Sequence, residues 1–170
     1  MRRRVSAARR VVLGGLLGAL LVVCKEVLAP VPGVEPVTPL ILFYAMELPA
    51  LGPWAVTVFV VLQFLLYGFG LWSWGYLYIW FLLFFVARAL HRMDSAVGWA
   101  LVAGSFGLGF GALFTPIYWL TQGPGGALGW WLAGIPTDVA HCIANFGVML
   151  VLYRPLRPVF RRLAAKSQNP

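Results

Sequence analysis

The seven residues ELPALGP, from Glu47 to Pro53, interrupt an apolar stretch that runs from Val37 to Tyr67. They hold two prolines and a glycine, and residues of this kind stop or kink a helix. The stretch therefore forms either one long kinked helix or two short helices. This choice fixes the total number of helices, and with it whether the two ends of the chain lie on one side of the bundle or on opposite sides.

The composition points to a lipid environment. Of the 170 residues, 61% are hydrophobic and only 11% are charged, and the mean hydropathy is +0.85. A soluble domain of this size would carry about 25% charged residues. A helix that crosses a bilayer needs ~20 residues, so the chain has room for roughly five or six such helices and for no soluble domain. We predict one all-α integral membrane domain over residues 1–170.

Basic residues gather at the two ends of the chain and in one internal loop, which holds Arg88 and Arg92. Cytoplasmic loops of membrane proteins carry an excess of Lys and Arg. Five helices would place the basic ends on opposite sides of the membrane, whereas six place both ends and the internal loop in the cytoplasm. The net charge of +8 therefore indicates topology and contact with the lipid bilayer, and not a nucleic-acid partner. The terminal basic residues are Arg2, Arg3, Arg4, Arg9, Arg10, Arg154, Arg157, Arg161, Arg162 and Lys166.

We predict six transmembrane helices, with the N and C termini both cytoplasmic. Two features fit this topology poorly: the turn 47–53 contains no Lys or Arg, and the second helix is short. The first apolar run is longer than that of a signal peptide and no A-x-A site follows it, so we expect it to be retained. The sequence leaves open whether Cys24 and Cys142 pair. The predicted helices cover residues 11–29, 37–48, 53–67, 76–90, 98–120 and 128–153.

The chain lacks the common motifs of nucleotide binding and hydrolysis. It contains no G-x-x-x-x-G-K-[ST] sequence, and no H-E-x-x-H, G-x-S-x-G or C-x-x-C pattern. Its only histidines are His91 and His141. We therefore predict no cofactor, no metal site and no enzymatic activity on this chain.

Three polar residues share one face of the last predicted helix. The stretch AGIPTDVAHCIANFGV (133–148) carries Asp138, His141 and Asn145, spaced i, i+3 and i+7. Polar groups inside a bilayer are costly unless paired, so these three either bond to neighbouring helices or line a cavity. Pro136 is expected to kink the helix at this level, and irregular backbone at membrane depth favours a cavity. We predict that the three residues bind a solute.

Three loops are predicted to face outward, at 30–36, 67–76 and 121–126, and none contains Lys or Arg. Aromatic residues crowd the loop 67–76, and Glu35 and Gln122 lie in the other two. Rings at this depth form either an interfacial belt or a stacking pocket, and the sequence leaves both open. The glycines of the middle loop would let it fold inward. The candidate substrate-binding residues are Glu35, Tyr67, Trp72, Trp74, Tyr76, Gln122, Trp131, Asp138, His141 and Asn145.

The first predicted helix carries small residues four positions apart. Gly14 and Gly18, and beside them Gly15 and Ala19, allow another helix to approach closely. The approaching helix belongs either to this chain or to a partner protein.

Three segments together resemble a known family. The segments GVEPVTPLILFYAMEL (33–48), YGFGLWSWGYLYIW (67–80) and AGIPTDVAHCIANF (133–146), the last followed by YRPL (153–156), are similar to the S components of energy-coupling factor (ECF) vitamin transporters. S components are the substrate-binding membrane subunits of these importers. The resemblance covers nearly the whole chain.

The resemblance implies six helices with cytoplasmic ends and an outward pocket built from the later helices and the outer loops. It implies as partners a transmembrane T component and a pair of ATP-binding subunits, which would explain the missing nucleotide motif. In the family, the first helix commonly carries an A-x-x-x-A coupling motif, and Gly14 and Gly18 stand at comparable positions here. The expected location is the cell membrane of a prokaryote.

Several functions therefore remain as hypotheses. The first is capture of a vitamin or vitamin precursor, with the aromatic residues favouring a flat ring. The alternatives are a proton-coupled carrier of small solutes, a membrane enzyme that uses Asp138 and His141 as acid and base, and an assembly protein that binds no small molecule.

Overall fold

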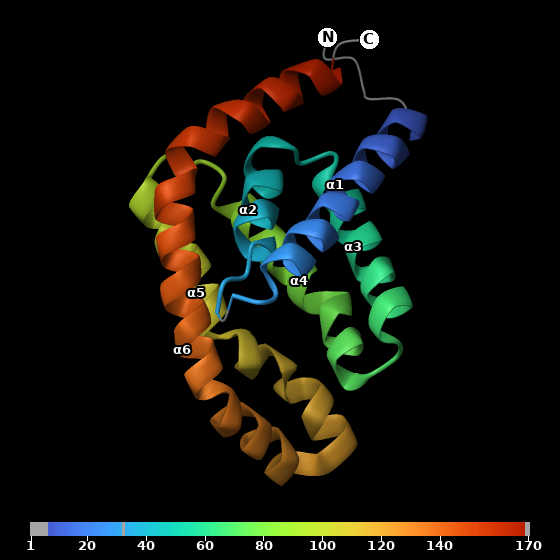
Figure 1. Ribbon diagram of the computed structural model, residues 1–170, viewed down its shortest axis with the longest axis vertical. Coiled ribbons are helices and arrows are strands. Elements are labelled where there is room, and N and C mark those ends of the chain that lie inside the picture. The colour runs from blue at the N-terminus through green and yellow to red at the C-terminus, as the bar shows by residue number, and fades with distance from the viewer. Residues whose placement is uncertain (1–6, 32, 169–170) are drawn as a thin grey trace.

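The computed structural model describes residues 7–31 and 33–168, and it is all-helical over this part of the chain. Arg2, Arg3 and Arg4, which support the predicted topology, lie outside the described residues. Residue Gly123 leaves helical geometry, with φ 73° and ψ −179°, and divides α6 into a short arm (110–122) and a long arm (124–168). The helices are α1 (Ala7–Leu28), α2 (Val37–Glu47), α3 (Gly52–Tyr67), α4 (Leu71–Ala89), α5 (Ala96–Leu108) and α6 (Phe110–Gln168) (Figure 1).

The surface of the protein suits a bilayer. Among the described residues, three helical ranges are long and apolar enough to cross a membrane: Ala7–Leu28, Leu71–Ala89 and Ala96–Ser167. Large apolar side chains point outward from several helices, with Leu65, Leu120 and Ile143 exposed by 75%, 85% and 70%. Soluble proteins rarely expose extended apolar patches of this kind, whereas lipid tails solvate them. The prediction of an all-helical protein compatible with a membrane is confirmed at this level.

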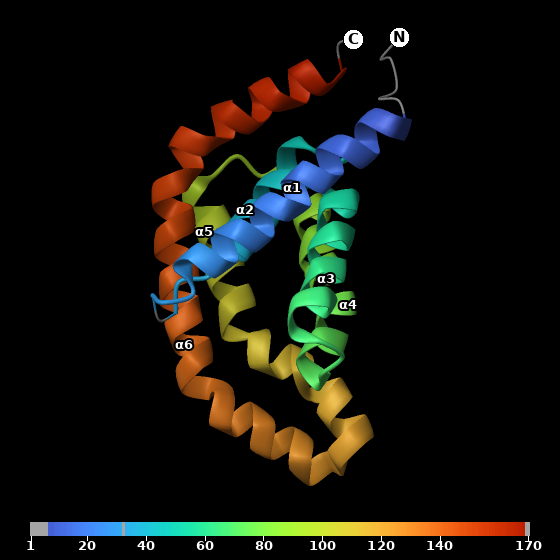
Figure 2. The same cartoon turned by 45° about the vertical axis from the view of Figure 1, so that its right-hand side comes forward.

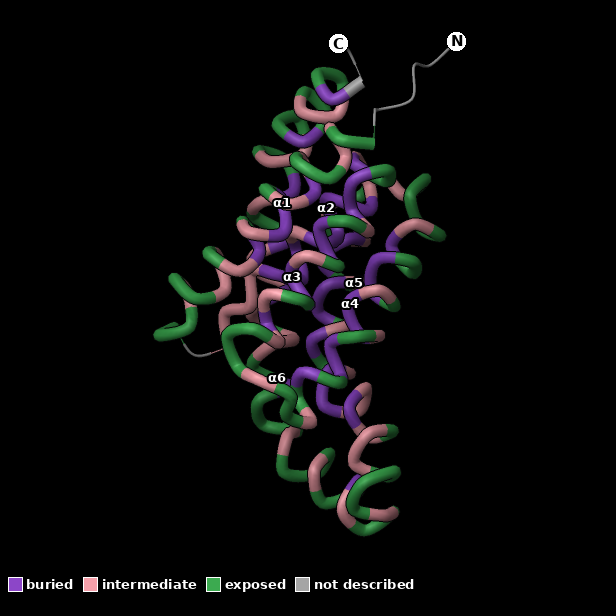
Figure 3. Tube along the Cα trace, turned by 90° about the vertical axis from the view of Figure 1, so that its right-hand side faces the viewer, coloured by how far each residue is buried: buried purple, intermediate pink, exposed green. Residues whose placement is uncertain are grey.

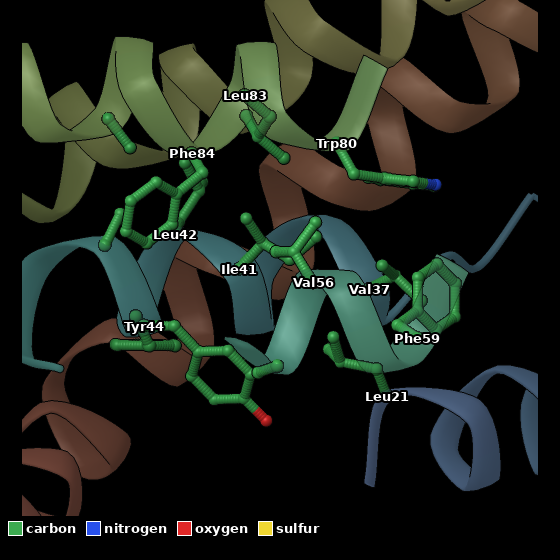
Figure 4. Packing of buried hydrophobic residues seen from close by; sticks show 14 of the residues in the cluster. Leu21, Val37, Ile41, Leu42, Tyr44, Val56, Phe59, Trp80, Leu83 and Phe84 are labelled. Carbon is green, nitrogen blue, oxygen red and sulfur yellow. The ribbon is translucent and has the colours of Figure 1, made fainter. Parts of the chain in front are cut away.

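The short helix α2 forms the centre of the molecule. Eight of its 11 residues are buried, among them Ile41, Leu42 and Tyr44. It contacts all five other helices, and Figure 4 shows side chains of α1, α3 and α4 closing around it. The Tyr44 hydroxyl donates a hydrogen bond to the carbonyl of Leu17 at 3.1 Å, and Phe43 stacks on Phe160 of the long arm with ring centroids 5.1 Å apart. Figure 3 shows that burial is concentrated at this level of the molecule and thins out toward the turn of α6.

The two described ends of the chain lie at the same end of the molecule (Figures 1 and 2). The guanidinium of Arg9 donates to the carbonyl oxygen of Lys166 at 2.8 Å, which ties α1 to the long arm. The α2–α3 turn and the α4–α5 loop lie at this end as well, and the turn of α6 lies at the other (Figure 1). We call these the basic end and the α6-turn end.

Arg157 of the long arm brings positive charge to the ELPALGP turn, which has no basic residue of its own. Its guanidinium Nε lies 2.9 Å from Oε1 of Glu47, and Nε of Arg161 lies 3.2 Å from the same oxygen. Arg157 also pairs with Asp94 in the α4–α5 loop, and the Tyr153 hydroxyl donates to Asp94 at 2.9 Å. The long arm of α6 thus supplies the positive charge beside the α2–α3 turn.

The predicted helix boundaries differ most from the structure at three places. The fourth helix begins at Leu71 and not at 76, because Gly70 caps it and the Ser73 hydroxyl bonds to the carbonyl of Gly68 at 2.7 Å. The fifth segment, predicted as one helix over 98–120, is divided between α5 and the short arm at Gly109. The long arm continues as one helix to Gln168, past the predicted end at 153.

Pro136 does not interrupt the helix, because the backbone angles stay helical at this residue, although the long arm bends along its length (Figures 1 and 2). Among the described residues of α6 only Gly123 has non-helical angles. A proline removes one backbone donor, but packing of the long arm on α5 holds the helix together through it.

The small residues of α1 face α3. A Cβ atom at Gly14 would lie 2.5 Å from Cβ of Trp54, and one at Gly18 would lie 2.6 Å from Cβ of Val58. At Gly15 a Cβ atom would meet nothing within 4 Å. The close approach expected from the glycine spacing therefore occurs within this chain, and the partner-coupling role of Gly14 and Gly18 stays a prediction.

We expect Arg157→Ala to lower the free energy of unfolding by roughly 1–3 kcal/mol, because it leaves the Glu47 carboxylate partly buried with its best partner removed. Thermal unfolding of the detergent-solubilised protein measures the change. Arg154→Ala is the matched control, since Arg154 is exposed on the same arm. Equal stability of the two variants would show that the ion pairs do not hold the basic end together.

Gly18→Leu is expected to destabilise the isolated protein by about 1–3 kcal/mol or more, because the added side chain overlaps α3. Gly15→Leu places the same side chain in open space and is expected to leave the melting temperature unchanged. If both variants unfold at the same temperature, α1 and α3 do not pack through Gly18.

Candidate functional site

A cavity of about 200 Å³ lies between the start of α4 and the two arms of α6, in the half of the molecule that holds the α6 turn. Trp72 comes from α4, Phe110 and Phe114 come from the short arm, and Trp130 comes from the long arm. These four rings form most of the wall. The remaining lining residues are Gly111, Gly134, Thr137, Asp138 and His141.

The rings hold one another in place. Trp72 stacks on Phe114 with centroids 4.6 Å apart and planes inclined by 17°, and Trp130 stacks on Tyr118 at 4.1 Å and 13°. Phe110 meets Trp72 edge-on at 5.9 Å. Stacked and edge-on pairs at these distances are the favoured aromatic geometries. The cavity therefore has rigid aromatic walls before any ligand arrives.

The long arm presents one continuous face to the cavity. Trp130, Gly134, Thr137, Asp138 and His141 follow a spacing of four, three, one and three residues, which keeps them on one side of a helix. Gly134 contributes no side chain and so leaves room between Trp130 and Asp138. Sequence periodicity is thus sufficient to explain why these residues meet.

Asp138, on the long arm, caps the start of the short arm. The Gly111 amide donates to both carboxylate oxygens, at 3.0 and 3.1 Å. Gly111 stands in the first turn of the short arm, where amide groups are without helical partners and a negative charge is favourable. Because the helix is interrupted at Gly109, the Gly111 amide is left without a helical acceptor, and the Asp138 carboxylate accepts its hydrogen bond.

Glycines of α5 and of the short arm allow the long arm to approach closely beside the cavity. A Cβ atom at Gly107 would lie 2.8 Å from the backbone of His141, and one at Gly111 would lie 2.5 Å from Oδ2 of Asp138. Gly104 lies against Cys142 in the same way. Sequence reasoning missed these residues, although their spacing of three and four residues marks one face of a helix.

Of the predicted site residues, the structure places Trp72, Asp138 and His141 at the cavity. Asp138 is 3% exposed and its neighbour one turn on, His141, is half-buried. Asn145 is buried one further turn along and does not line the cavity; its side-chain oxygen accepts no hydrogen bond from the described residues.

The other predicted aromatic residues lie on different faces. Tyr76 is buried in the core, against Phe59 and Trp80. Trp74 meets Phe64 edge-on at 5.7 Å, away from the cavity, and Trp131 is exposed. The residue of the pair at 130–131 that reaches the cavity is Trp130, which the sequence prediction passed over.

Tyr67 belongs to a polar cluster at the ends of α1 and α3. Its hydroxyl donates to Glu26 at 2.6 Å, and Nζ of Lys25 lies 3.1 Å from the same carboxylate and 4.6 Å from the Tyr67 ring centre. Gln122 is exposed beside the Gly123 turn. Neither Tyr67 nor Gln122 lines the cavity of the described structure.

Glu35 sits in the loop between α1 and α2. The Val37 amide donates to its carboxylate at 3.2 Å. Removal from water raises the pKa of Glu35 to about 7, and the Val37 amide and the charge of Lys25 oppose this shift. Glu35 is therefore the group in this loop that titrates near neutral pH.

A larger hollow of about 560 Å³ lies between α4 and the α5–short arm segment. Its lining is apolar apart from Ser105, and Leu82, Val86 and Leu101 open it to the outer surface. Solute sites combine an apolar wall with a few converging polar groups, and only the smaller cavity has both. We take the larger hollow as a lipid-facing groove.

The described residues contain no group of three or more His, Cys, Asp or Glu side chains that could hold a metal ion. Cys24 and Cys142 are both free thiols. Chemistry at the cavity rests on Asp138, His141, Thr137 and the aromatic walls.

No match to this chain is found among protein-family models, curated protein sequences or solved structures.

We expect the stability of the protein to fall as the pH rises from about 4.5 to 7. In this window the folded protein retains the Glu35 proton that the unfolded chain has released, so unfolding releases a proton and is favoured by higher pH. Glu35→Gln removes the titrating group. The melting temperature of the wild type, relative to this variant, should decrease across the window; a constant difference would show that Glu35 titrates normally.

Proposed function

We propose that this protein is the substrate-binding membrane subunit of an ECF-type importer, which captures a vitamin or vitamin precursor from the outer side for ATP-driven uptake. The observation that supports this most directly is the cavity itself. It combines rigid aromatic walls with a buried carboxylate and an imidazole, and it lies in the half of an apolar helical protein that is remote from the basic end.

The proposed topology follows from the distribution of charge. The basic end collects Arg9, Arg88, Arg157 and Arg161, and a cytoplasmic position of this end agrees with the excess of positive charge in cytoplasmic loops. All six helices then cross or enter the bilayer, with α2 too short to cross it alone at about 16 Å. The location is the cell membrane of a prokaryote, and the cavity opens toward the outside.

The proposed partners are a T component and two ATP-binding subunits, as the family resemblance implies. The chain carries no P-loop sequence, so ATP hydrolysis is assigned to other chains. Coupling through α1 remains part of the proposal, with Gly14 and Gly18 as its residues. Because both glycines contact α3, a larger side chain at either position would also displace α3.

The cavity supports solute binding better than catalysis. The Gly111 amide donates to both oxygens of the Asp138 carboxylate and so sets the orientation of this group. His141 lies one turn away on the same helix, and its ring meets Phe110 edge-on at 5.9 Å. An acid–base pair needs both groups directed at one reacting atom.

Uptake is expected only when the protein is assembled with an ECF module. Small molecules bound to the purified protein are first identified by mass spectrometry. Proteoliposomes with this protein alone should bind that molecule without concentrating it, and those that also contain the T component and ATP-binding subunits should accumulate it when ATP is supplied.

A T-component complex whose ATP-binding subunits lack the P-loop lysine is the control and should not accumulate the molecule. Accumulation by the protein alone under a proton gradient would favour the carrier. A product that forms without ATP would favour an enzyme, and the absence of any bound molecule or uptake would favour an assembly protein.

A further inference from the structure

We propose that the cavity binds a compact organic cation that carries its positive charge on or beside a flat ring. This inference rests on the proposed function and adds to it the charge and shape of the solute. It starts from the charges that surround the cavity.

Asp138 is a buried carboxylate without a basic partner. It is 3% exposed, and the described structure gives it the Gly111 amide as hydrogen-bond donor but no ion pair with Lys or Arg. One amide leaves most of the lone pairs of a carboxylate available. Buried charges are normally paired, and intramembrane acids usually face a cavity and a counter-charge.

Apart from His141, the described lining of the cavity supplies no side chain that can carry a positive charge. Among the described residues that line it, Asp138 is the one acidic residue and none is Lys or Arg. His141 is the nearest titratable neighbour on the long arm, one turn from Asp138. A cationic ligand would therefore complete the site, whereas an anionic ligand would meet the carboxylate and find no fixed positive charge.

The aromatic walls favour the same ligand class. The faces of Trp72, Phe110, Phe114 and Trp130 carry the negative part of the ring quadrupole, which attracts cations, most strongly at tryptophan. Because Trp72 already stacks on Phe114 and Trp130 on Tyr118, a flat ligand ring would lie against the parts of these rings that line the cavity. The volume of about 200 Å³ lies below the 300–1,000 Å³ typical of drug-sized ligands, so the ligand must be small.

Calorimetry with two matched probes tests the inference. Benzamidinium and benzamide have the same planar arrangement of heavy atoms and differ in charge. For the full chain in lipid nanodiscs, we expect benzamidinium to bind at least about tenfold more tightly than benzamide, as a charge-assisted contact to a carboxylate predicts. Equal affinities, or no detectable binding of benzamidinium, would overturn the inference.

Variants separate the charge of Asp138 from its capping role. Asp138→Asn keeps an oxygen that can accept the Gly111 amide but removes the charge, so it should fold normally and lose the preference for benzamidinium. Trp72→Leu should weaken the binding of benzamidinium severalfold. Asp94→Asn makes the same change in the α4–α5 loop at the basic end, and this variant should bind benzamidinium as the wild type does. A preference retained in Asp138→Asn would overturn the inference.

The outcome is distinguishable from failure of the proposed function. If a neutral vitamin co-purifies and is accumulated with ATP while benzamidinium does not bind, the importer stands and the cation inference falls. If benzamidinium binds through Asp138 but no ATP-driven uptake occurs with any ECF module, the site binds cations and the importer assignment is wrong.

Discussion

Burial of an 11-residue helix is the constraint on which the rest of the structure depends. Such a helix is about 16 Å long and cannot cross a bilayer alone, so its polar ends are stable at membrane depth only when other helices surround it. All five other helices contact α2. Its length is set by the ELPALGP turn, which ends it at Glu47 and starts α3 at Gly52. The turn therefore sets the end of the helix that all the others pack against.

Ion pairs at the basic end solve a problem that the turn creates. Glu47 ends a buried helix where a carboxylate is costly, and Arg157 and Arg161 lie within ion-pair distance of it. The same guanidinium of Arg157 reaches Asp94 in the next loop. One side chain from the end of the chain thus fixes two turns formed much earlier in it. The turn contains no basic residue in sequence, but two arginines of the long arm lie beside it in the structure.

The sequence was most informative where it contains breakers or polar residues. ELPALGP could be interpreted because proline and glycine act locally, and the spacing of Asp138 and His141 predicted that both face one way. It failed where every candidate is apolar. Trp130 and Trp131 lie at similar angles on either side of the face that Asp138, His141 and Asn145 mark, so periodicity does not show which of them reaches the cavity. Gly111 acquires its role only through the break at Gly109 and a carboxylate 27 residues away.

The long arm of α6 links the two ends of the molecule physically. It carries Asp138 at the cavity and Arg157 at the basic end, about 28 Å apart along a helix at 1.5 Å per residue. Its backbone angles stay helical throughout this distance, including at Pro155. The arm bends along its length (Figures 1 and 2), and at the basic end it is held by the ion pairs of Arg157 with Glu47 and Asp94. The cavity and the ion pairs of the basic end are therefore built on one continuous helix.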